Sequence, residues 1–170
     1  MQNVIYGVNG PVVTVANTKD FSMQEMVFVG EDRLVGEVIG IHDDFTTIQV
    51  YEVTTGLKPG APVFPTGGPL SVTLGPGIIS NIFDGIERPL KDMEEQSGYF
   101  IERGSDVDSL NTDRLWEVTL LKKAGDTLEP GDIYATCPET DSIEHRMMVP
   151  FGIQGTVTYA AENGRYRVND

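Results

Sequence analysis

The 170-residue sequence has one cysteine, two histidines and no long apolar run. A single cysteine, Cys137, cannot form an internal disulfide, which excludes a disulfide scaffold and favours a reducing compartment. Cys137 ends the mostly apolar stretch 133–137, so we interpret it as a small buried residue rather than a reactive thiol. No stretch approaches the roughly 18 apolar residues of a membrane-spanning helix, and residues 1–8 do not resemble a signal peptide. We therefore expect a cytoplasmic chain with no direct membrane insertion.

Basic side chains are scarce. There are 12 Lys and Arg against 26 Asp and Glu, for a formal net charge of −14. Such a charge repels phosphate backbones and anionic lipid headgroups, so we expect no nucleic-acid partner. It favours solubility and basic protein partners. The apolar fraction of 39% is enough for the packed core of one large or two small domains and argues against disorder.

Motifs for catalysis or nucleotide binding are also missing. The dipeptide Gly-Lys never occurs, so there is no phosphate-binding loop, in which backbone amides and a lysine hold the phosphates. The nearest glycine-rich sequence is Gly75-Pro76-Gly77, but Pro76 has no amide hydrogen to donate, and we interpret it as a tight turn. Gly-x-Ser-x-Gly is absent, and two distant histidines give no serine a visible base.

Two histidines have acidic neighbours that could in principle help to bind a metal. His42 precedes Asp43 and Asp44, and His145 follows Glu144. Neither has a second histidine or a cysteine at ligand spacing, which a protein metal site needs. We interpret the first group as a solvated turn and the second as a histidine at the edge of a strand.

The segment 92–111 is polar and acidic. Its candidates for acid–base chemistry are Glu94, Glu95, Asp106 and Asp108. No basic or apolar pattern surrounds them, so a hydrated linker explains them better. The sequence therefore predicts no catalytic, cofactor-binding or metal-binding residue, although a site assembled through the fold stays open.

Apolar residues alternate with polar ones over most of the chain, which is typical of β-strands. The clearest pair is 34–41 and 46–51, separated by a turn at residues 42–45. Several short strands divided by turn signals predict a small closed barrel of six or seven strands over 1–74. A second small β-barrel or barrel-sandwich unit is expected over 112–170, with a two-residue hairpin at Asn163-Gly164. The predicted fold class is therefore all-β, with little helix.

The connector between these units is predicted to span 75–111. Its first part continues from a strand whose apolar positions are Leu70, Val72 and Leu74, and turns at Gly75-Pro76-Gly77. A short apolar segment at 78–83 is expected to be helical, and the acidic linker follows it. We expect the connector's apolar face either to pack on the second unit or to be mobile; its members are Ile78, Ile79, Ile82 and Phe83.

Part of the second unit resembles the flattened barrel of biotinyl and lipoyl carrier domains. The similar strings are 125–133, 145–150 and 152–157. Carrier domains present a lysine at an exposed hairpin tip, where its amine is acylated. Here the comparable positions are 144–147, and the permanently protonated guanidinium of Arg146 cannot replace that amine. We interpret the likeness as one of fold, and keep a free-standing carrier or ligand-binding module as the alternative function.

Several strings in the correct order carry a second resemblance. They are GPVV at 10–13, LVGEVI at 34–39, QVYEVTTGL at 49–57, GPGIISNIFDGIERPL at 75–90 and, further on, LWE, GDIY and IEHRMMVP at 115–117, 131–134 and 143–150. Together they resemble the catalytic A subunit of V-type and A-type rotary ATPases, over essentially the whole chain. The last group matches the inserted bulge, or non-homologous region, which separates A subunits from related F-type β and V-type B subunits.

The resemblance implies a role in a larger assembly. The first unit would be the crown barrel in a ring of alternating A and B subunits, and the second would be the bulge that contacts the peripheral stalk. The parent would couple ATP hydrolysis or synthesis to proton or sodium translocation, with ATP and Mg²⁺ as cofactors, from a cytoplasmic position peripheral to the membrane. The phosphate-binding loop and catalytic residues of that family match no position here, so the segment itself is expected to be non-catalytic and without a cofactor.

Overall fold

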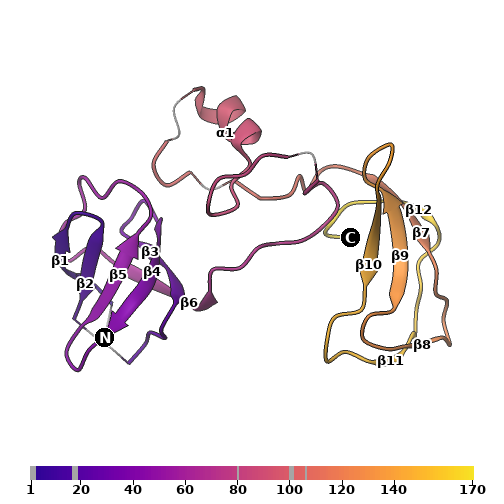
Figure 1. Ribbon diagram of the computed structural model, residues 1–170, viewed down its shortest axis with the longest axis horizontal. Helices are drawn as coiled ribbons and strands as arrows, with labels where there is room; N and C mark the ends of the chain where they lie inside the picture. Colours follow the sequence, from indigo (N-terminus) through magenta and orange to yellow (C-terminus); the bar gives the residue numbers. More distant parts are fainter. Residues whose placement is uncertain (1–2, 17–18, 80, 100–101, 106) are drawn as a thin grey trace. The chain divides into compact units, whose positions relative to one another are not determined.

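The computed structural model describes residues 3–16, 19–79, 81–99, 102–105 and 107–170. These residues form twelve strands and one short helix, which confirms the all-β fold class. The chain folds into two compact units, shown in Figure 1. Unit 1 contains Met1–Val72 and Asp92–Val107, and unit 2 contains Thr73–Lys91 and Asp108–Asp170. Each unit has its own cluster of buried apolar side chains.

Unit 1 is a closed barrel. Its strands are β1 (Ile5–Asn9), β2 (Val12–Val15), β3 (Glu25–Val29), β4 (Leu34–Ile41), β5 (Thr46–Val50) and β6 (Val63–Pro69), paired antiparallel in the order β1-β2-β5-β4-β3-β6. The two outer strands also meet: the Ile5 amide donates to the Ala61 carbonyl, and the Val63 amide donates to the Asn3 carbonyl, both at 2.8 Å. Because the first and last strands are joined, the barrel has no long open edge.

The alternating sequence pattern explains the barrel core. Along β3 every second residue is buried, so one face of the strand lines the interior. The eleven buried members of the core are Ile5, Val13, Val15, Phe21, Val27, Val29, Leu34, Val38, Ile48, Val50 and Val63. Each such side chain contributes about 1.5–3 kcal/mol when it leaves water. The predicted turn at 42–45 is confirmed: it closes the β4–β5 hairpin with a 2.9 Å bond from the His42 amide to the Phe45 carbonyl.

Unit 2 contains two small antiparallel sheets. Its strands are β7 (Trp116–Leu120), β8 (Thr127–Leu128), β9 (Ile133–Pro138), β10 (Glu144–Met148), β11 (Gly155–Thr156) and β12 (Gly164–Tyr166). Four of them form a sheet in the order β10-β9-β7-β12, and β11 pairs with β8. The buried residues of its core are Trp116, Val118, Ala135 and Cys137. The burial predicted for Cys137 is thus confirmed, and burial is also the main reason that the pKa of its thiol is raised.

The hairpin predicted at Asn163-Gly164 is wrong. Gly164 begins β12, but β12 pairs with β7, which lies far earlier in the chain. The Asn163 side-chain oxygen instead accepts a hydrogen bond of 2.9 Å from the Leu120 amide. A two-residue hairpin requires a partner strand directly before the turn, and the residues before Asn163 form no strand. The preceding strand, β11, ends at Thr156.

The secondary structure predicted for the connector also needs correction. Residues 70–74 form no strand, and the described residues of 78–83 form no helix. The helix, α1 (Leu90–Ser97), lies instead in the segment interpreted as an irregular acidic linker. It begins directly after Pro89, has Asp92 in its first turn and is followed by Gly98 with a φ of +77°. Met93 is its buried residue, so a largely polar composition hid a short helix with good end signals.

Candidate functional site: the seat of the connector turn

The glycine turn of the connector is seated closely on unit 2. A Cβ atom at Gly75 would lie 2.7 Å from Leu110 Cδ1, and a Cβ at Gly77 would lie 3.3 Å from Trp116 Cζ2. Gly77 also has a φ of +109°, a backbone conformation that side-chain-bearing residues rarely adopt. The turn therefore needs glycine for space at one position, and for both space and backbone conformation at the other.

One carboxylate on unit 2 holds this turn. The amides of Gly77 and Ile79 both donate to Oε1 of Glu139, at 2.7 Å and 3.0 Å. Two neighbouring amides that converge on one anion form a small anion-binding concavity. The other carboxylate oxygen lies 3.2 Å from Nδ1 of His145 on β10. The Glu139 side chain is only 1% exposed, so its charge is satisfied almost entirely by these groups.

The surroundings of Glu139 favour its ionised form. Burial by itself raises the pKa of a carboxyl group, and it is the largest single influence here. The amides of Gly77 and Ile79, together with the His145 imidazole, act in the opposite direction and outweigh burial, so the pKa of Glu139 lies below its ordinary value. Glu139 is therefore ionised, and its hydrogen bonds from the two turn amides are charge-assisted.

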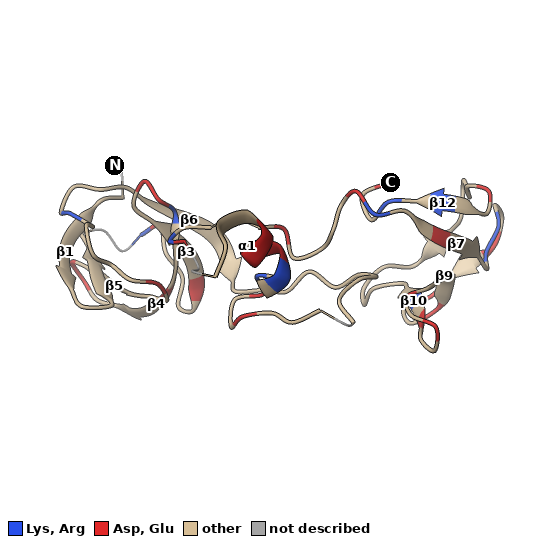
Figure 2. Ribbon diagram, turned by 90° about the horizontal axis from the view of Figure 1, so that it is seen from above, with Lys and Arg blue, Asp and Glu red and all other residues tan. Residues whose placement is uncertain are grey.

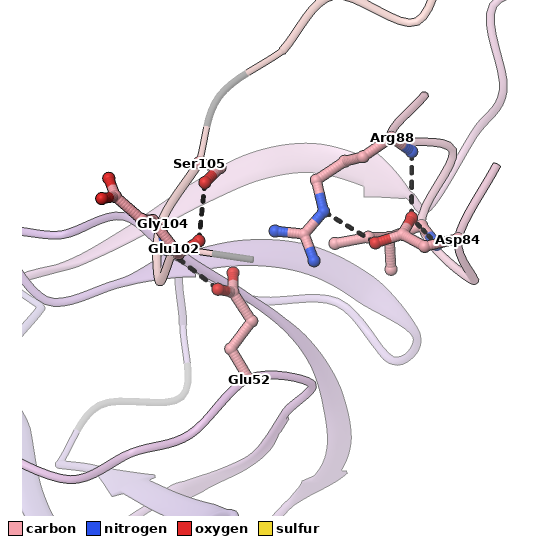
Figure 3. Close-up of polar contacts among 7 residues, drawn as sticks. Glu52, Asp84, Arg88, Glu102, Gly104 and Ser105 are labelled. Atoms are coloured by element: carbon pink, nitrogen blue, oxygen red, sulfur yellow. Dashed lines mark hydrogen bonds and ion pairs between the residues drawn. The ribbon is translucent and has the colours of Figure 1, made fainter. Parts of the chain in front are cut away.

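A second carboxylate closes the following loop. Asp84 Oδ1 accepts hydrogen bonds from the amides of Ile86 at 3.0 Å and Arg88 at 2.9 Å, and Asp84 Oδ2 pairs with Arg88 Nε at 2.8 Å (Figure 3). Phe83 and Pro89 form an isolated bridge across the same loop. Burial raises the pKa of Asp84, but the bonds from Arg88 and Ile86 outweigh it and lower the pKa. We call residues 83–89 the clasp; it is closed by these local bonds, and its Glu87 carboxylate also accepts a 2.8 Å hydrogen bond from the Thr73 amide.

The predicted apolar face of the connector does not form a packed stripe. The connector residues 73–91 belong to unit 2, and they touch it through the glycine turn. Ile78 and Phe83 are half-buried, whereas Ile79 and Ile82 are 43% and 72% exposed. The apolar side chains are unevenly covered because the described residues of 78–83 form no helix with one apolar face.

A cavity of about 650 Å³ lies beside the seat, within unit 2. It is lined by residues 73–76 of the connector, by residues of β7, β9, β10 and β12, and by 108–112 and 167–170 in part. Trp116 lines it and is 4% exposed, and its indole Nε1 has no hydrogen-bond partner among the described residues. The described lining combines apolar side chains with hydroxyl groups, such as those of Ser109 and Thr112, and holds no cysteine, histidine or lysine.

Unit 1 has a comparable anchor for the chain that returns to it. The Gly104 amide donates to Glu52 Oε2 at 2.9 Å, a bond drawn in Figure 3. Arg103 bonds the Thr55 carbonyl and the Asp32 carboxylate. A Cβ at Gly104 would lie 2.3 Å from the Asp32 carbonyl oxygen, so glycine is required there. The 102–105 loop is therefore fixed on the barrel.

The two histidine groups of the sequence belong to different units: His42 lies in unit 1 and His145 in unit 2. His42, Asp43 and Asp44 are exposed in the β4–β5 turn, as predicted. His145 lies on β10, an edge strand, and Glu144 beside it is exposed. Among the described residues no group of three or more His, Cys, Asp or Glu converges as metal ligands would.

The acidic candidates are dispersed. Glu94 and Glu95 are exposed on α1, and Asp108 is exposed at the rim of the cavity. Asp106 lies outside the described residues. Figure 2 shows acidic positions on both units and on α1, with basic positions sparser. Of the described candidates, Glu94 and Glu95 belong to unit 1 and Asp108 belongs to unit 2.

Glu139 is the site residue that sequence reasoning missed. It directly follows β9, but its amide partners lie 60 and 62 positions away, so no local spacing could reveal it. Positions 144–147, which the sequence suggested as comparable to a carrier's hairpin tip, instead belong to β10; the tip of the β9–β10 hairpin is 139–143. Within the described part of the chain, no helix is long and apolar enough to cross a membrane.

Comparisons with known proteins identify the class of both units. Residues 5–67 match the beta-barrel domain of the ATP synthase alpha/beta family, and residues 107–170 match the ATP synthase alpha/beta subunit barrel-sandwich domain. The chain belongs to the ATP synthase alpha/beta family and carries its non-catalytic N-terminal domains.

The more particular similarity is to V-type ATP synthase alpha chains. The chain is 52% identical to that of Halothermothrix orenii over 162 residues, which covers 95% of this chain and 28% of the relative. It is 48% identical to alpha chain 2 of Clostridium tetani over 166 residues, covering 98% of this chain and 28% of the relative. These findings confirm the resemblance seen in the sequence. The chain thus spans little more than a quarter of the length of these relatives, in their N-terminal region.

Among solved structures, the assembled ATPase EscN of the enteropathogenic E. coli type III secretion system is similar at a TM-score of 0.47 and 20% identity. The match covers 52% of this chain and 21% of that one. A similarity of this size carries no argument here.

Proposed function

We propose that this chain acts as an assembly module of a V-type ATP synthase alpha subunit. In this proposal the barrel of unit 1 joins a ring of alternating A and B subunits, and unit 2 contacts a peripheral stalk. The observation that carries the proposal is the pairing of a closed six-stranded barrel with a barrel-sandwich unit, at about half identity to alpha chains over nearly the whole chain.

We propose further that the parent protein couples ATP hydrolysis or synthesis to proton or sodium translocation, with ATP and Mg²⁺ bound outside this stretch. The proposal rests on the names of the relatives and on the missing Gly-Lys dipeptide. A phosphate-binding loop needs that lysine to reach the terminal phosphates. The 170 residues by themselves are therefore expected to have no ATPase activity.

The proposed division of labour follows the predicted domains. Residues 1–74 supply the crown barrel, 75–111 the connector, and 112–170 the stalk-facing unit. Unit 1 has exposed apolar side chains suited to a protein interface: Tyr6 on β1 is 73% exposed, and Val53 after β5 is 69% exposed. Unit 2 has its own, with Phe151 95% exposed.

The test measures binding of this chain to the B subunit encoded by the same organism. The combined variant Tyr6→Ser and Val53→Ser should raise the dissociation constant about tenfold or more, because buried aromatic and apolar anchors dominate interfaces. Phe151→Ser is the control: it removes a still more exposed apolar side chain from unit 2 and should leave B-subunit binding unchanged. Equal weakening by both variants, or no binding at all by the wild-type chain, contradicts the proposed role of unit 1.

The alternative of a carrier module is tested on the same preparation. An acylated carrier would have a mass above that of the unmodified chain by the mass of its group. We expect the unmodified mass of 18.6 kDa, because the comparable hairpin positions hold no lysine. A covalent adduct in intact-mass spectrometry would favour the carrier instead.

A further inference from the structure

We propose that Glu139 is a latch: its buried carboxylate holds the connector on unit 2 through the amides of Gly77 and Ile79, and its release frees the glycine turn without unfolding either the clasp at 83–89 or the sheet. This is a conformational device within unit 2, and it does not depend on the proposed function.

The first argument is that a single carboxylate holds the turn. Two amides of the turn donate to the same carboxylate oxygen, and the acceptor comes from a strand end some 60 positions away. Pro76 between the two glycines cannot donate, and the Ile78 amide lies 3.4 Å from the Gly75 carbonyl within the turn. The attachment of the turn thus depends on one side chain rather than on a ladder of backbone bonds.

The second argument is the exposure of what surrounds the turn. Leu74 before it is 78% exposed, and Ile82 after it is 72% exposed. Segments with few buried apolar contacts open at low free-energy cost. Once the carboxylate releases the turn, the apolar contacts left to oppose its opening are mainly those of the turn itself, beside Leu110 and Trp116.

The third argument is that the neighbouring structure can survive release. The clasp is closed by local bonds between Asp84, Ile86 and Arg88, none of which involves Glu139. The sheet core beneath the turn is held by β7 and β9 through their own pairing. His145, 25% exposed, gives the second carboxylate oxygen a partner at the border with solvent. Opening is thus confined to the turn.

The test follows individual amides and Trp116 in three variants. In Glu139→Ala the Gly77 and Ile79 amides should exchange with solvent about tenfold faster or more, since charge-assisted bonds are the stronger class. Glu139→Gln should give an intermediate rate, because an amide oxygen still accepts but carries no charge. Glu144→Gln, an exposed glutamate on β10, is the matched control and should leave both rates unchanged.

Trp116, the only tryptophan, gives a second readout. Its ring edge adjoins Gly77, so release of the turn should make its fluorescence more accessible to acrylamide in Glu139→Ala. Protected Val118 and Ala135 amides in the same sample show that the sheet is folded.

The latch is contradicted by any of three results. The first is that the amides of Gly77 and Ile79 exchange freely with solvent in the wild-type chain. This result contradicts the latch even if a variant fails to fold. The second is that their exchange rates are equal in wild type and Glu139→Gln. The third is that Glu139→Ala exposes the core amides of the sheet together with the turn, which would make Glu139 part of the core rather than a latch.

Discussion

At Gly77 three requirements fall on one residue. Its backbone has a φ of +109°, its missing side chain leaves room for Trp116, and its amide is bonded to Glu139. The first two disfavour any residue with a side chain, and the third requires only a backbone amide. Gly77 is therefore a position where a small change tests the geometry of the seat without touching its charge.

Gly77→Ala should destabilise unit 2 by about 1–3 kcal/mol, because a Cβ is strained at positive φ and would crowd the Trp116 ring. Urea unfolding followed by Trp116 fluorescence measures the change. Gly85→Ala is the matched control in the same connector, since Gly85 has no positive φ and a Cβ added there would meet no described atom within 4 Å. Its effect should lie near zero. Equal losses in the two variants would contradict the steric account of the turn.

The residue scale also shows the limit of reading a sequence. The glycine turn was predictable, because Gly-Pro-Gly restricts the backbone locally. Glu139 was not, because its role depends on a contact across 62 positions of chain that only the fold creates. The groups that did attract attention, such as His42 with Asp43 and Asp44, have reactive side chains but lie exposed in a turn.

Among the elements, the connector was the hardest to predict. The apolar segment 78–83 suggested a helix, yet Asp84 follows it and binds the amides of its own loop, which competes with helical bonding. The helix forms at 90–97 instead, where Pro89 precedes it and Gly98 ends it. Local end signals were more informative than apolar content for so short a helix.

The attachment of the connector should depend on pH. The pKa of Glu139 is lower in the folded chain than its unfolded value of about 4.3, so the carboxylate stabilises the fold above that pH and loses this contribution as pH falls through the folded pKa. The His145 imidazole faces the Glu139 carboxylate directly, and the Cys137 thiol interacts with it electrostatically.

The measurement compares wild type with Glu139→Gln by urea unfolding between about pH 3 and pH 7. We expect a difference in unfolding free energy of about 1–3 kcal/mol near neutral pH, which shrinks as pH falls through the lowered pKa of folded Glu139 and its carboxylate becomes protonated. Glu144→Gln shows the effect of removing an exposed charge. Its unfolding free energy should differ little from that of wild type across this pH range. A difference for Glu139→Gln that grows on acidification would contradict the lowered pKa.

For the whole molecule, strand alternation and the resemblance to rotary-ATPase A subunits together predicted a barrel followed by a second β unit, and both are confirmed. The closure of the barrel depends on the pairing of residues 3–5 with residues 61–63, which no local pattern determines. The pairing of β12 with β7 was missed for the same reason. In both units, therefore, the sequence did not predict how residues far apart in the chain pair with one another.

Because each unit has its own buried core, the two should respond separately to core mutations. Ile48→Ala removes a fully buried side chain from the barrel and should destabilise unit 1 by about 2–5 kcal/mol. Amide exchange of β3, measured by mass spectrometry in increasing urea, reports unit 1, and Trp116 fluorescence reports unit 2. We expect the β3 transition to move to lower urea while the Trp116 transition stays in place. Val118→Ala in the core of unit 2 is the reciprocal control and should move only the Trp116 transition. If either substitution shifts both transitions equally, the chain unfolds as one cooperative body and the two cores are not independent.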